Sequence, residues 1–417
     1  DELRVELGEL IAVDGGVELV GARARGARHA VQTRNRTLAM LVAQSIMEDL
    51  RGHPYGQPAP ASWPIGPRPK TETFTFYVDG RPQEMVFRKQ VTLENGTVGY
   101  GSTAHGRATA AVIDDHLGPQ LVGQDVMTGE RLADMSFRMT QLYGSSGLAS
   151  YAVSAVDIAC WDARAKLLER PVYELLGGPQ KEKIFCYATG NDVDWYQELG
   201  FRAFKLACPY GPADGLDGLR KNEEFVAKTR AQIGDDCELM LDCWMAFDVE
   251  YTVRLAEALR PYRLKWIEEC LIPDDREGHR SLRRRLPWQT LTTGEHWYTA
   301  LPFQWAAHHR VVDIVQPDIN WCGGVTVCQK IAAAAEAAGI GVILHGGGNT
   351  AAGQHFSHGS AAVPWLECFV GTPPGVPLEE AWALPGQAVP KDGWLTPSDG
   401  PGFGLEVPDA WYEPFFG

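Results

Sequence analysis

The sequence predicts an α/β fold in which a (β/α)8-type barrel follows an N-terminal α+β domain. Its 417 residues are enough for two domains. Between about residues 183 and 372, short apolar runs alternate with amphipathic helical stretches, as in parallel strands joined by helices. Earlier in the chain, alternating apolar residues and a hairpin signal indicate a small antiparallel sheet. We therefore predict an α+β domain over residues 1–150 and the barrel over residues 151–372, with residues 373–417 packing back on the first domain.

The predicted first domain contains a small sheet followed by two helices. Asn95-Gly96 is a tight-hairpin signal between segments whose apolar residues alternate. Residues before this sheet carry weak and mixed signals. The predicted strands are Thr73–Tyr77, Val86–Leu93 and Val98–Tyr100, and the predicted helices are Ala108–Leu121 and Ser150–Leu168.

The barrel prediction depends on eight apolar runs that each precede or follow a helical stretch. Such continuous runs are typical of buried parallel strands, and eight of them fit a closed barrel better than an open sheet. Gly339 follows the last of the clearest helices and predicts its C-terminal cap. The strand candidates are Ile184–Ala188, Ala203–Ala207, Leu239–Leu241, Leu264–Ile267, Thr290–Thr293, Val311–Gln316, Val342–Leu344 and Trp365–Val370. The clearest helices are Gly218–Ile233, Val249–Leu259 and Thr326–Ala338.

Composition excludes several classes of protein. Hydrophobic residues make up 45% of the chain and charged residues 22%, which is ordinary for a globular protein. The net charge of −15 argues against nucleic acid or an anionic membrane as a partner. No apolar run is long enough to span a membrane. The nine cysteines are scattered without a Cys-x-x-Cys pair, so no zinc knuckle or thioredoxin motif is present. Most lie inside apolar runs, which indicates small buried apolar side chains in a reducing compartment, and we expect the cytoplasm.

Three acidic residues stand at the ends of three successive predicted strands. Asp242, Glu268 and Glu295 are separated by 26 and 27 residues, so one carboxylate is expected at the same height on each strand. Three carboxylates that converge without lysine partners would repel one another. Mg²⁺ resolves this repulsion because it takes oxygen ligands and leaves positions open for water or substrate. The spacing therefore predicts a Mg²⁺ site.

Four more polar side chains end strands of the same barrel. Asp318 and His345 end neighbouring strands, and we expect a hydrogen-bonded pair in which the carboxylate orients the imidazole as a base. Lys205 ends the second strand and can donate to a bound carboxylate or to the metal ligands. Glu367 ends the eighth strand and is expected to hydrogen-bond the charge that develops on the substrate.

These motifs resemble the mandelate racemase subgroup of the enolase superfamily, and within it most closely the L-rhamnonate dehydratase branch. The resemblance extends over almost the whole barrel and is highly specific for the superfamily. It is carried by Ser154–Asp162, Pro171–Gly178, Tyr187–Gly190, Leu241–Met245, Lys265–Leu271, Gly294–His296, Gln316–Asp318, Trp321–Gly324 and Pro401–Gly404.

The resemblance implies a capping domain on a modified TIM barrel, with Mg²⁺ held by Asp242, Glu268 and Glu295. It also implies that an aldonic acid loses its C2 proton and its C3 hydroxyl, giving a 2-keto-3-deoxy acid. Catalysis is then assigned to four residues, and substrate binding to three that partly overlap with them. The expected catalytic residues are His345, Asp318, Glu367 and Lys205, and the expected substrate contacts are His296, Lys205 and Glu367.

Other activities remain open at this stage. The substrate is expected to be a small sugar acid such as L-rhamnonate, with L-lyxonate or L-mannonate as alternatives. Members of the subgroup often carry a Lys-x-Lys pair on the second strand, but the second position here is Ala207. Because inversion of a carbon needs a base on each face, this absence counts against a racemase or epimerase. A metal-dependent hydrolase would need a His-x-His motif at the end of the first strand, and Cys186–Thr189 does not contain one. We also expect a homo-oligomer with no nucleic-acid or membrane partner.

Overall fold

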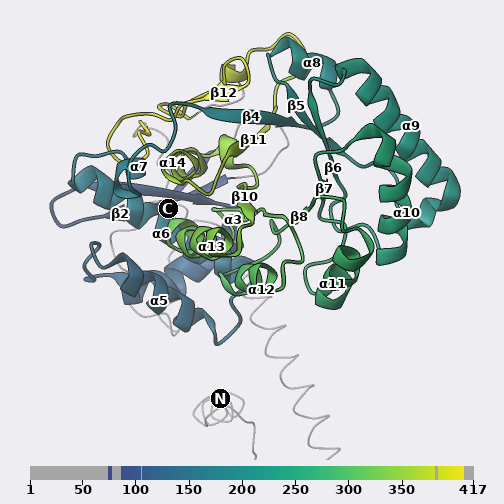
Figure 1. Ribbon diagram of the computed structural model, residues 1–417. Helices are drawn as coiled ribbons and strands as arrows, with labels where there is room; N and C mark the ends of the chain where they lie inside the picture. The colour runs from purple at the N-terminus through teal and green to yellow at the C-terminus, as the bar shows by residue number, and fades with distance from the viewer. Residues whose placement is uncertain (1–73, 78–85, 105, 381–383, 408–417) are drawn as a thin grey trace, which may run out of the picture. The chain divides into compact units, whose positions relative to one another are not determined.

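The computed structural model describes residues 74–77, 86–104, 106–380 and 384–407 (Figure 1). The remaining parts of the predicted first domain and C-terminal segment, including residues 1–73 and 408–417, lie outside the described residues. Within these residues, a three-stranded antiparallel sheet is followed by a curled parallel sheet surrounded by helices. The predicted fold class is confirmed.

The antiparallel sheet has the order β1-β2-β3. Its strands are β1 (Phe74–Tyr77), β2 (Val86–Thr92) and β3 (Val98–Thr103). The predicted Asn95-Gly96 turn joins β2 to β3, and Gly96 adopts a φ of 84° that favours glycine. The Gly96 amide donates to the carbonyl of Leu93 at 2.9 Å, which closes the hairpin.

Helix α6 (Leu148–Leu167) packs directly on β3, and two glycines of the strand make this possible. A Cβ atom at Gly99 or Gly101 would collide with backbone carbonyls of α6. The predicted helix over residues 108–121 is partly different, because a π-helical segment (Ile113–Leu117) interrupts it. The other helices of this region are α3 (Gly106–Val112), α4 (Gly118–Leu121) and α5 (Gly129–Thr140).

All eight predicted barrel strands are present and parallel, in the order β10-β9-β8-β7-β6-β5-β4-β11. Hydrogen bonding does not join β10 to β11 among the described residues, so the sheet is curled but not closed as expected (Figure 1). The strands are β4 (Ile184–Thr189), β5 (Ala203–Ala207), β6 (Glu238–Asp242), β7 (Ile267–Glu268), β8 (Leu291–Thr293), β9 (Ile314–Val315), β10 (Gly341–Val342) and β11 (Trp365–Phe369).

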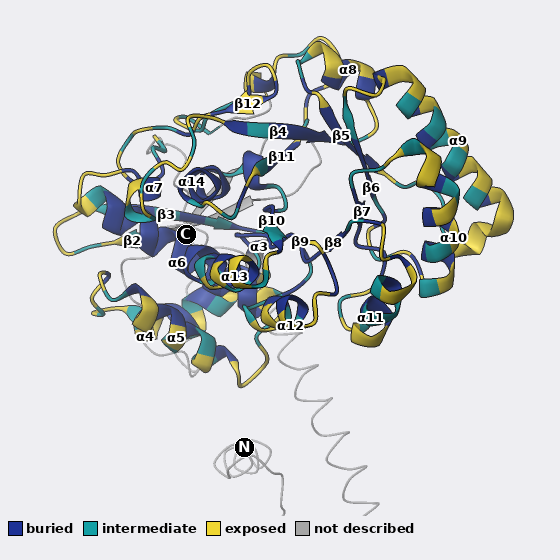
Figure 2. Cartoon of the chain, in the orientation of Figure 1, coloured by how far each residue is buried: buried dark blue, intermediate teal, exposed yellow. Residues whose placement is uncertain are grey.

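Helices connect these strands and cover the outer face of the sheet. Most of them expose a polar face, whereas every residue of the helix over residues 351–359 is buried (Figure 2). The predicted cap of α13 is confirmed, because Gly339 adopts a left-handed conformation with a φ of 66°. The helices are α7 (Val172–Leu175), α8 (Val193–Glu198), α9 (Gly215–Ile233), α10 (Val249–Leu259), α11 (Arg276–Arg285), α12 (Leu301–His309), α13 (Gly324–Ala338) and α14 (Ala351–Gly359).

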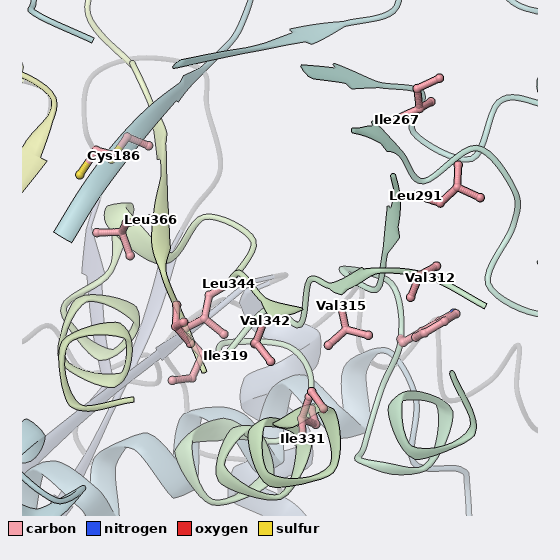
Figure 3. Close-up of a cluster of buried hydrophobic side chains, with 14 of the residues drawn as sticks. Cys186, Ile267, Leu291, Val312, Val315, Ile319, Ile331, Val342, Leu344 and Leu366 are labelled. Atoms are coloured by element: carbon pink, nitrogen blue, oxygen red, sulfur yellow. The ribbon is translucent and has the colours of Figure 1, made fainter. Parts of the chain in front are cut away.

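The alternation of side chains along the strands divides the barrel core into two layers. One large buried cluster fills the space between strands and helices and includes Phe204, Leu241 and Leu366 (Figure 3). Their neighbours one residue away face the other side of the sheet, where a second cluster contains Met240 and Trp266. By the same alternation, Lys205, Asp242, Glu268 and Glu367 belong to this inner face, so the strands themselves direct their polar ends inward.

The C-terminal segment contacts both parts of the chain. Strand β12 (Trp394–Leu395) pairs antiparallel with β4 of the barrel. The buried carboxylate of Asp162 on α6 accepts hydrogen bonds from the amides of Tyr100 and Phe403, each at 2.8 Å, and from Lys166. One side chain thus connects β3, α6 and the C-terminal segment. The domain division at residues 150 and 373 stays a prediction.

Among the described residues, no helix has the length and hydropathy needed to cross a membrane. All nine cysteines are free thiols, and seven of them are buried. This agrees with their predicted role as small apolar side chains.

Burial of His355 on α14 predicts a loss of stability in acid. Burial, together with repulsion by His358, lowers the pKa of this imidazole from its usual value near 6.5 to about 3. The folded state therefore keeps His355 neutral, whereas the unfolded state takes up a proton as the pH falls below about 6.5. We expect His355 to lower the free energy of unfolding by about 2 kcal/mol between pH 7.5 and pH 5.

Urea unfolding at these two pH values measures this effect. His355→Gln should lose about 2 kcal/mol of the wild-type pH dependence, and the exposed control His308→Gln should retain all of it. An unchanged pH dependence in His355→Gln would show that this histidine is not the group that titrates.

Candidate metal centre and active site

The three predicted metal ligands converge at the carboxyl ends of the strands. Asp242 ends β6, Glu268 ends β7, and Glu295 follows β8 by two residues. One carboxylate oxygen from each lies within 4.8 Å of the others. Glu268 and Glu295 are buried, with exposed fractions of 1% and 4%. The arrangement that the spacing predicts is therefore present, although the identity of the ligands stays a prediction.

Burial makes this cluster unfavourable without a cation. It raises the pKa of Glu268 to about 8 and that of Glu295 to about 7, although Lys205 and His345 oppose these shifts. A divalent ion would hold both groups as carboxylates at neutral pH. Closely spaced carboxylate oxygens are the donors that Mg²⁺ prefers, so the residues present fit this ion.

Lys205 is fully buried among the carboxylates. Its Nζ lies 3.1 Å from Asp242 Oδ2 and 2.7 Å from Glu367 Oε1, and it also pairs with Glu268. Burial lowers the pKa of Lys205, but these carboxylates raise it to well above the usual value. Lys205 thus pairs with two of the three predicted metal ligands, as expected for a residue that can donate to them, so these carboxylates do not converge without a lysine partner. One ammonium group still faces four carboxylates, counting Glu295, so excess negative charge remains for a metal ion.

Glu367 is fully buried, and both of its oxygens are hydrogen-bonded within the protein. Oε1 accepts from Thr189 Oγ1 at 2.6 Å and from Lys205, and Oε2 accepts from the Gly346 amide at 2.8 Å. Burial raises the pKa of Glu367, but the positive charges of Lys205 and His345 lower it to below its usual value. Glu367 is thus ionised and orients Lys205, while its contact with substrate stays a prediction.

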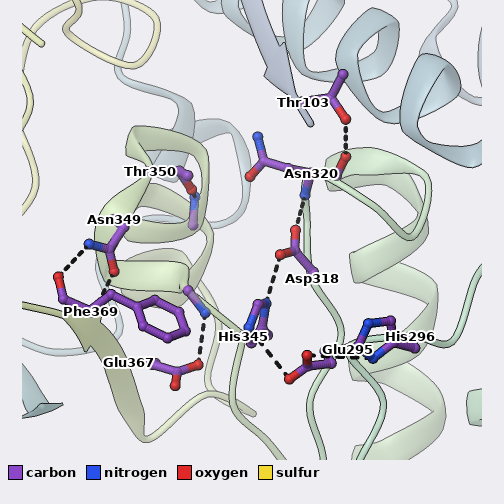
Figure 4. A network of polar contacts seen from close by, with 12 residues as sticks. Thr103, Glu295, His296, Asp318, Asn320, His345, Asn349, Thr350, Glu367 and Phe369 are labelled. Atoms are coloured by element: carbon purple, nitrogen blue, oxygen red, sulfur yellow. Dashed lines mark hydrogen bonds and ion pairs between the residues drawn. The ribbon is translucent and has the colours of Figure 1, made fainter. Parts of the chain in front are cut away.

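His345 and Asp318 form the expected pair (Figure 4). His345 Nδ1 donates to Asp318 Oδ2 at 2.8 Å, which leaves Nε2 facing Glu295 Oε2 at 3.4 Å. Burial lowers the pKa of His345, but Glu295 and Asp318 raise it to well above the usual value. The Nε2 atom of His345 therefore lies beside the carboxylate cluster, where a base could reach a molecule bound there.

Asp318 is held from the other side by the loop that follows it. Its Oδ1 accepts from the Asn320 amide at 2.7 Å. The Asn320 side chain donates to the carbonyl of Ser102 at 2.7 Å, and Thr103 donates to the Asn320 carbonyl at 2.7 Å. Strand β3 of the first domain thus fixes the loop that orients the histidine (Figure 4).

His296 lies beside the cluster, as expected for a residue that contacts substrate. Its Nδ1 is 2.9 Å from Glu269 Oε1 and 3.5 Å from Glu295 Oε1. The ring of Trp321 lies between those of His296 and His345, at centroid distances of 5.7 and 5.1 Å. The contact of His296 with substrate stays a prediction.

Sequence reasoning missed two residues that orient Glu268. Trp266 Nε1 and Gln316 Nε2 both donate to Glu268 Oε2, at 2.9 and 2.7 Å. The sequence could have indicated both residues, because Trp266 precedes Glu268 and Gln316 precedes Asp318 by two positions. Residues two positions apart on a strand face the same side of the sheet. Glu269 was also missed, and its φ of 45° turns its side chain toward His296.

Apart from Lys205, strand β5 carries no basic side chain. The subgroup often has a second lysine at the position of Ala207. Here the side chain of Asn191 forms hydrogen bonds with the backbone of Ala207. The Ala207 amide donates to Asn191 Oδ1 at 2.9 Å, and Asn191 Nδ2 donates to the Ala207 carbonyl at 3.2 Å. Strand β5 therefore offers Lys205 but no second lysine two residues on.

Family comparisons agree with this geometry. Residues 76–177 match the mandelate racemase / muconate lactonizing enzyme N-terminal domain, and residues 191–411 match the enolase C-terminal domain-like family. The chain belongs to the mandelate racemase / muconate lactonizing enzyme family of enolase-like proteins. This confirms the resemblance drawn from the motifs.

The individual proteins that this chain resembles include two rhamnonate dehydratases and a racemase. The L-rhamnonate dehydratase of Saccharopolyspora erythraea is 42% identical over 322 residues, covering 76% of this chain and 82% of that protein. A structure of rhamnonate dehydratase from Gibberella zeae complexed with Mg has a TM-score of 0.74 at 34% identity, covering 78% of this chain and 81% of that one. A racemase from Streptomyces coelicolor with bound magnesium has a TM-score of 0.71 at 26% identity, covering 81% and 96%.

Proposed function

We propose that this chain is a magnesium-dependent dehydratase that removes water from a sugar acid, with L-rhamnonate as the first candidate substrate. The observation that carries the proposal is the single His345–Asp318 pair whose free nitrogen faces the carboxylate cluster. The 42% identity to an L-rhamnonate dehydratase supports both the reaction and the substrate class.

Asp242, Glu268 and Glu295 would hold Mg²⁺. When bound, the ion supplies positive charge to the substrate carboxylate, which makes the neighbouring C2 proton more acidic. Lys205 adds a fixed positive charge, and Glu367 and Glu268 hold its ammonium in place. Trp266 and Gln316 fix the orientation of Glu268.

His345 acts first as a base and then as an acid. Its Nε2 takes the proton from C2, and the electron pair of that C–H bond forms a double bond between C2 and C3. The C3–O bond breaks, and the hydroxyl leaves as water with the proton from His345. The resulting enol tautomerises to the 2-keto-3-deoxy acid, so that one aldonate gives one keto acid and one water. Asp318 keeps the proton on Nδ1 and stabilises the imidazolium that forms.

Dehydration of another aldonate, such as L-lyxonate or L-mannonate, is the nearest alternative. A racemase or epimerase of the same family is a second alternative, and the magnesium-bound racemase from Streptomyces coelicolor has the same fold. The alanine at position 207 argues against it, because β5 then offers no second lysine. The expected homo-oligomer, the cytoplasmic location and the absence of nucleic-acid or membrane partners stay predictions.

A panel of aldonates tests the proposal. We expect a 2-keto acid to form from L-rhamnonate or a close stereoisomer in the presence of Mg²⁺, and its formation to stop in excess EDTA and resume when Mg²⁺ is restored. The 2-keto acid is measured by a colorimetric carbonyl assay, with substrate-free and enzyme-free samples as controls. A panel of L-rhamnonate, L-lyxonate, L-mannonate and D-gluconate that yields no keto acid would contradict the proposal.

A further inference from the structure

A second cavity lies away from the carboxylate cluster, where the start of α5 meets α6 and α13. Its volume is about 470 Å³, and its lining includes Gly129, Trp161, Arg164 and Thr326. No residue of the metal centre or of the His345–Asp318 pair lines it. The cavity is therefore a separate feature that the proposed reaction does not use.

The Arg164 guanidinium lines this cavity and forms no ion pair with a carboxylate of the described residues. Arg164 is only 8% exposed, and its side chain stacks on the ring of Trp161 at 4.1 Å. Its Nε donates to the Cys160 carbonyl at 3.2 Å, but Nη2 is buried and has no hydrogen-bond partner in the described part of the chain. A buried guanidinium group without a carboxylate is costly, because its charge is removed from water and not neutralised.

The N-terminus of α5 contributes a partial positive charge at the same cavity. Thr128 stands at the N-cap position but makes no capping hydrogen bond, because its hydroxyl donates to the Asp125 carbonyl at 2.7 Å. The first backbone amides of the helix are thus left uncapped by a side chain. Gly129 lets the guanidinium approach them, since a Cβ at this position would collide with Arg164.

Burial lowers the pKa of Arg164, and Asp157 and Glu130 oppose this only in part, because neither forms an ion pair with it in the described part of the chain. Glu130 also lines the cavity, but its side chain is 71% exposed and pairs with Lys330 at 2.7 Å. Asp157 is buried two turns earlier on α6, where its two oxygens accept from the hydroxyl and amide of Thr326. The guanidinium and the start of α5 therefore meet at one cavity, where no described carboxylate forms an ion pair with Arg164.

We infer that this cavity binds a small oxyanion of the phosphate type, held by Arg164 and the first amides of α5. Guanidinium groups and helix N-termini are both preferred partners of phosphate oxygens. The cavity is larger than a free oxyanion, so either inorganic phosphate or the phosphate group of a small metabolite can occupy it. The inference is independent of the proposed dehydratase activity.

Thermal unfolding at constant ionic strength tests the inference. Inorganic phosphate and glycerol 3-phosphate are titrated separately against a sodium chloride reference, in EDTA, so that binding through a metal ion is removed. We expect at least one of them to raise the Tm of the wild type in a saturable manner, and the more effective one to identify the source. Isothermal titration calorimetry gives the corresponding Kd.

Three variants assign the effect to this cavity. Arg164→Met should lose the saturable Tm shift, and its Tm without phosphate should equal or exceed that of the wild type because an unpaired buried charge is removed. Arg164→Lys keeps the charge but loses the planar donor pair, so its Kd should rise at least about tenfold. Arg138→Gln removes an exposed arginine of α5 and should bind phosphate as the wild type does.

Two results would overturn the inference: no saturable shift or heat with either phosphate compound in the wild type, or an unchanged Kd in Arg164→Lys. The second result remains decisive if Arg164→Met does not fold. The same titration in Asp242→Asn should be unchanged, which separates this site from the metal centre.

Discussion

His345→Asn is expected to lower kcat for keto acid formation by about 10³-fold or more, because the same imidazole both removes the C2 proton and delivers a proton to the leaving hydroxyl. Asparagine is polar and of similar size, but it cannot take up a proton at neutral pH. The exchange of the C2 hydrogen with solvent deuterium should disappear together with the keto acid. Both are measured in one sample by proton NMR in D₂O.

The exposed His308→Asn serves as the matched control and should retain wild-type activity. Circular dichroism and the Tm show whether His345→Asn is folded. Persistent C2 exchange in folded His345→Asn would mean that another group removes the proton, and it would contradict the role of His345.

Asp242→Asn should lose magnesium affinity and activity together. The amide keeps the shape of the side chain but removes one negative charge from a centre in which Glu268 and Glu295 are already unfavourable as carboxylates. Changes to residues that only support metal ligands often weaken binding 10- to 100-fold, so we expect loss of a ligand charge to weaken Mg²⁺ binding by about 100-fold or more. Isothermal titration calorimetry with Mg²⁺ measures the affinity directly.

Asp236→Asn is a matched control, because Asp236 is exposed and lies two residues before the same strand. It should bind Mg²⁺ and turn over substrate as the wild type does. Wild-type turnover by Asp242→Asn in excess chelator would contradict the assignment of the metal centre.

Much of the barrel could be predicted because each strand repeats one local pattern. Apolar runs such as Ala203–Ala207 have the length and composition of buried parallel strands, and the helices between them have an apolar face. Parallel strands also bring their carboxyl ends to one edge, so the spacing of Asp242, Glu268 and Glu295 predicted their convergence. The sequence pattern contains this information directly.

Other features depend on contacts between distant residues, which a single sequence does not display. The ion pairs of Lys205 join β5 to β7 and β11, and only the three-dimensional sheet shows that this lysine neutralises part of the proposed metal centre. The hydrogen bonds between Asn320 and β3 connect residues more than 200 positions apart. The π-helical segment at Ile113–Leu117 has no signal in the hydrophobic periodicity.

The cavity at Arg164 was also not predicted. From the sequence alone, the arginine at this position of α6 is an ordinary polar residue in the last turn of a helix. Its burial follows from Gly129 and Trp161, which belong to different elements or turns and shape the space around the guanidinium. The sequence identifies the residue types, whereas the absence of an anionic partner becomes visible only in the structure.

Analysis of recovered substrate in D₂O tests the central claim, which is that one base at a magnesium centre eliminates water. The wild type is incubated with the active aldonate and Mg²⁺ to partial conversion, and product and remaining substrate are examined by NMR. The account predicts a 2-keto-3-deoxy acid and remaining substrate without its C2 epimer, because Ala207 leaves Lys205 without the partner lysine that often serves as a base on the second face. Accumulation of the C2 epimer without keto acid would contradict the account and identify the protein as an epimerase.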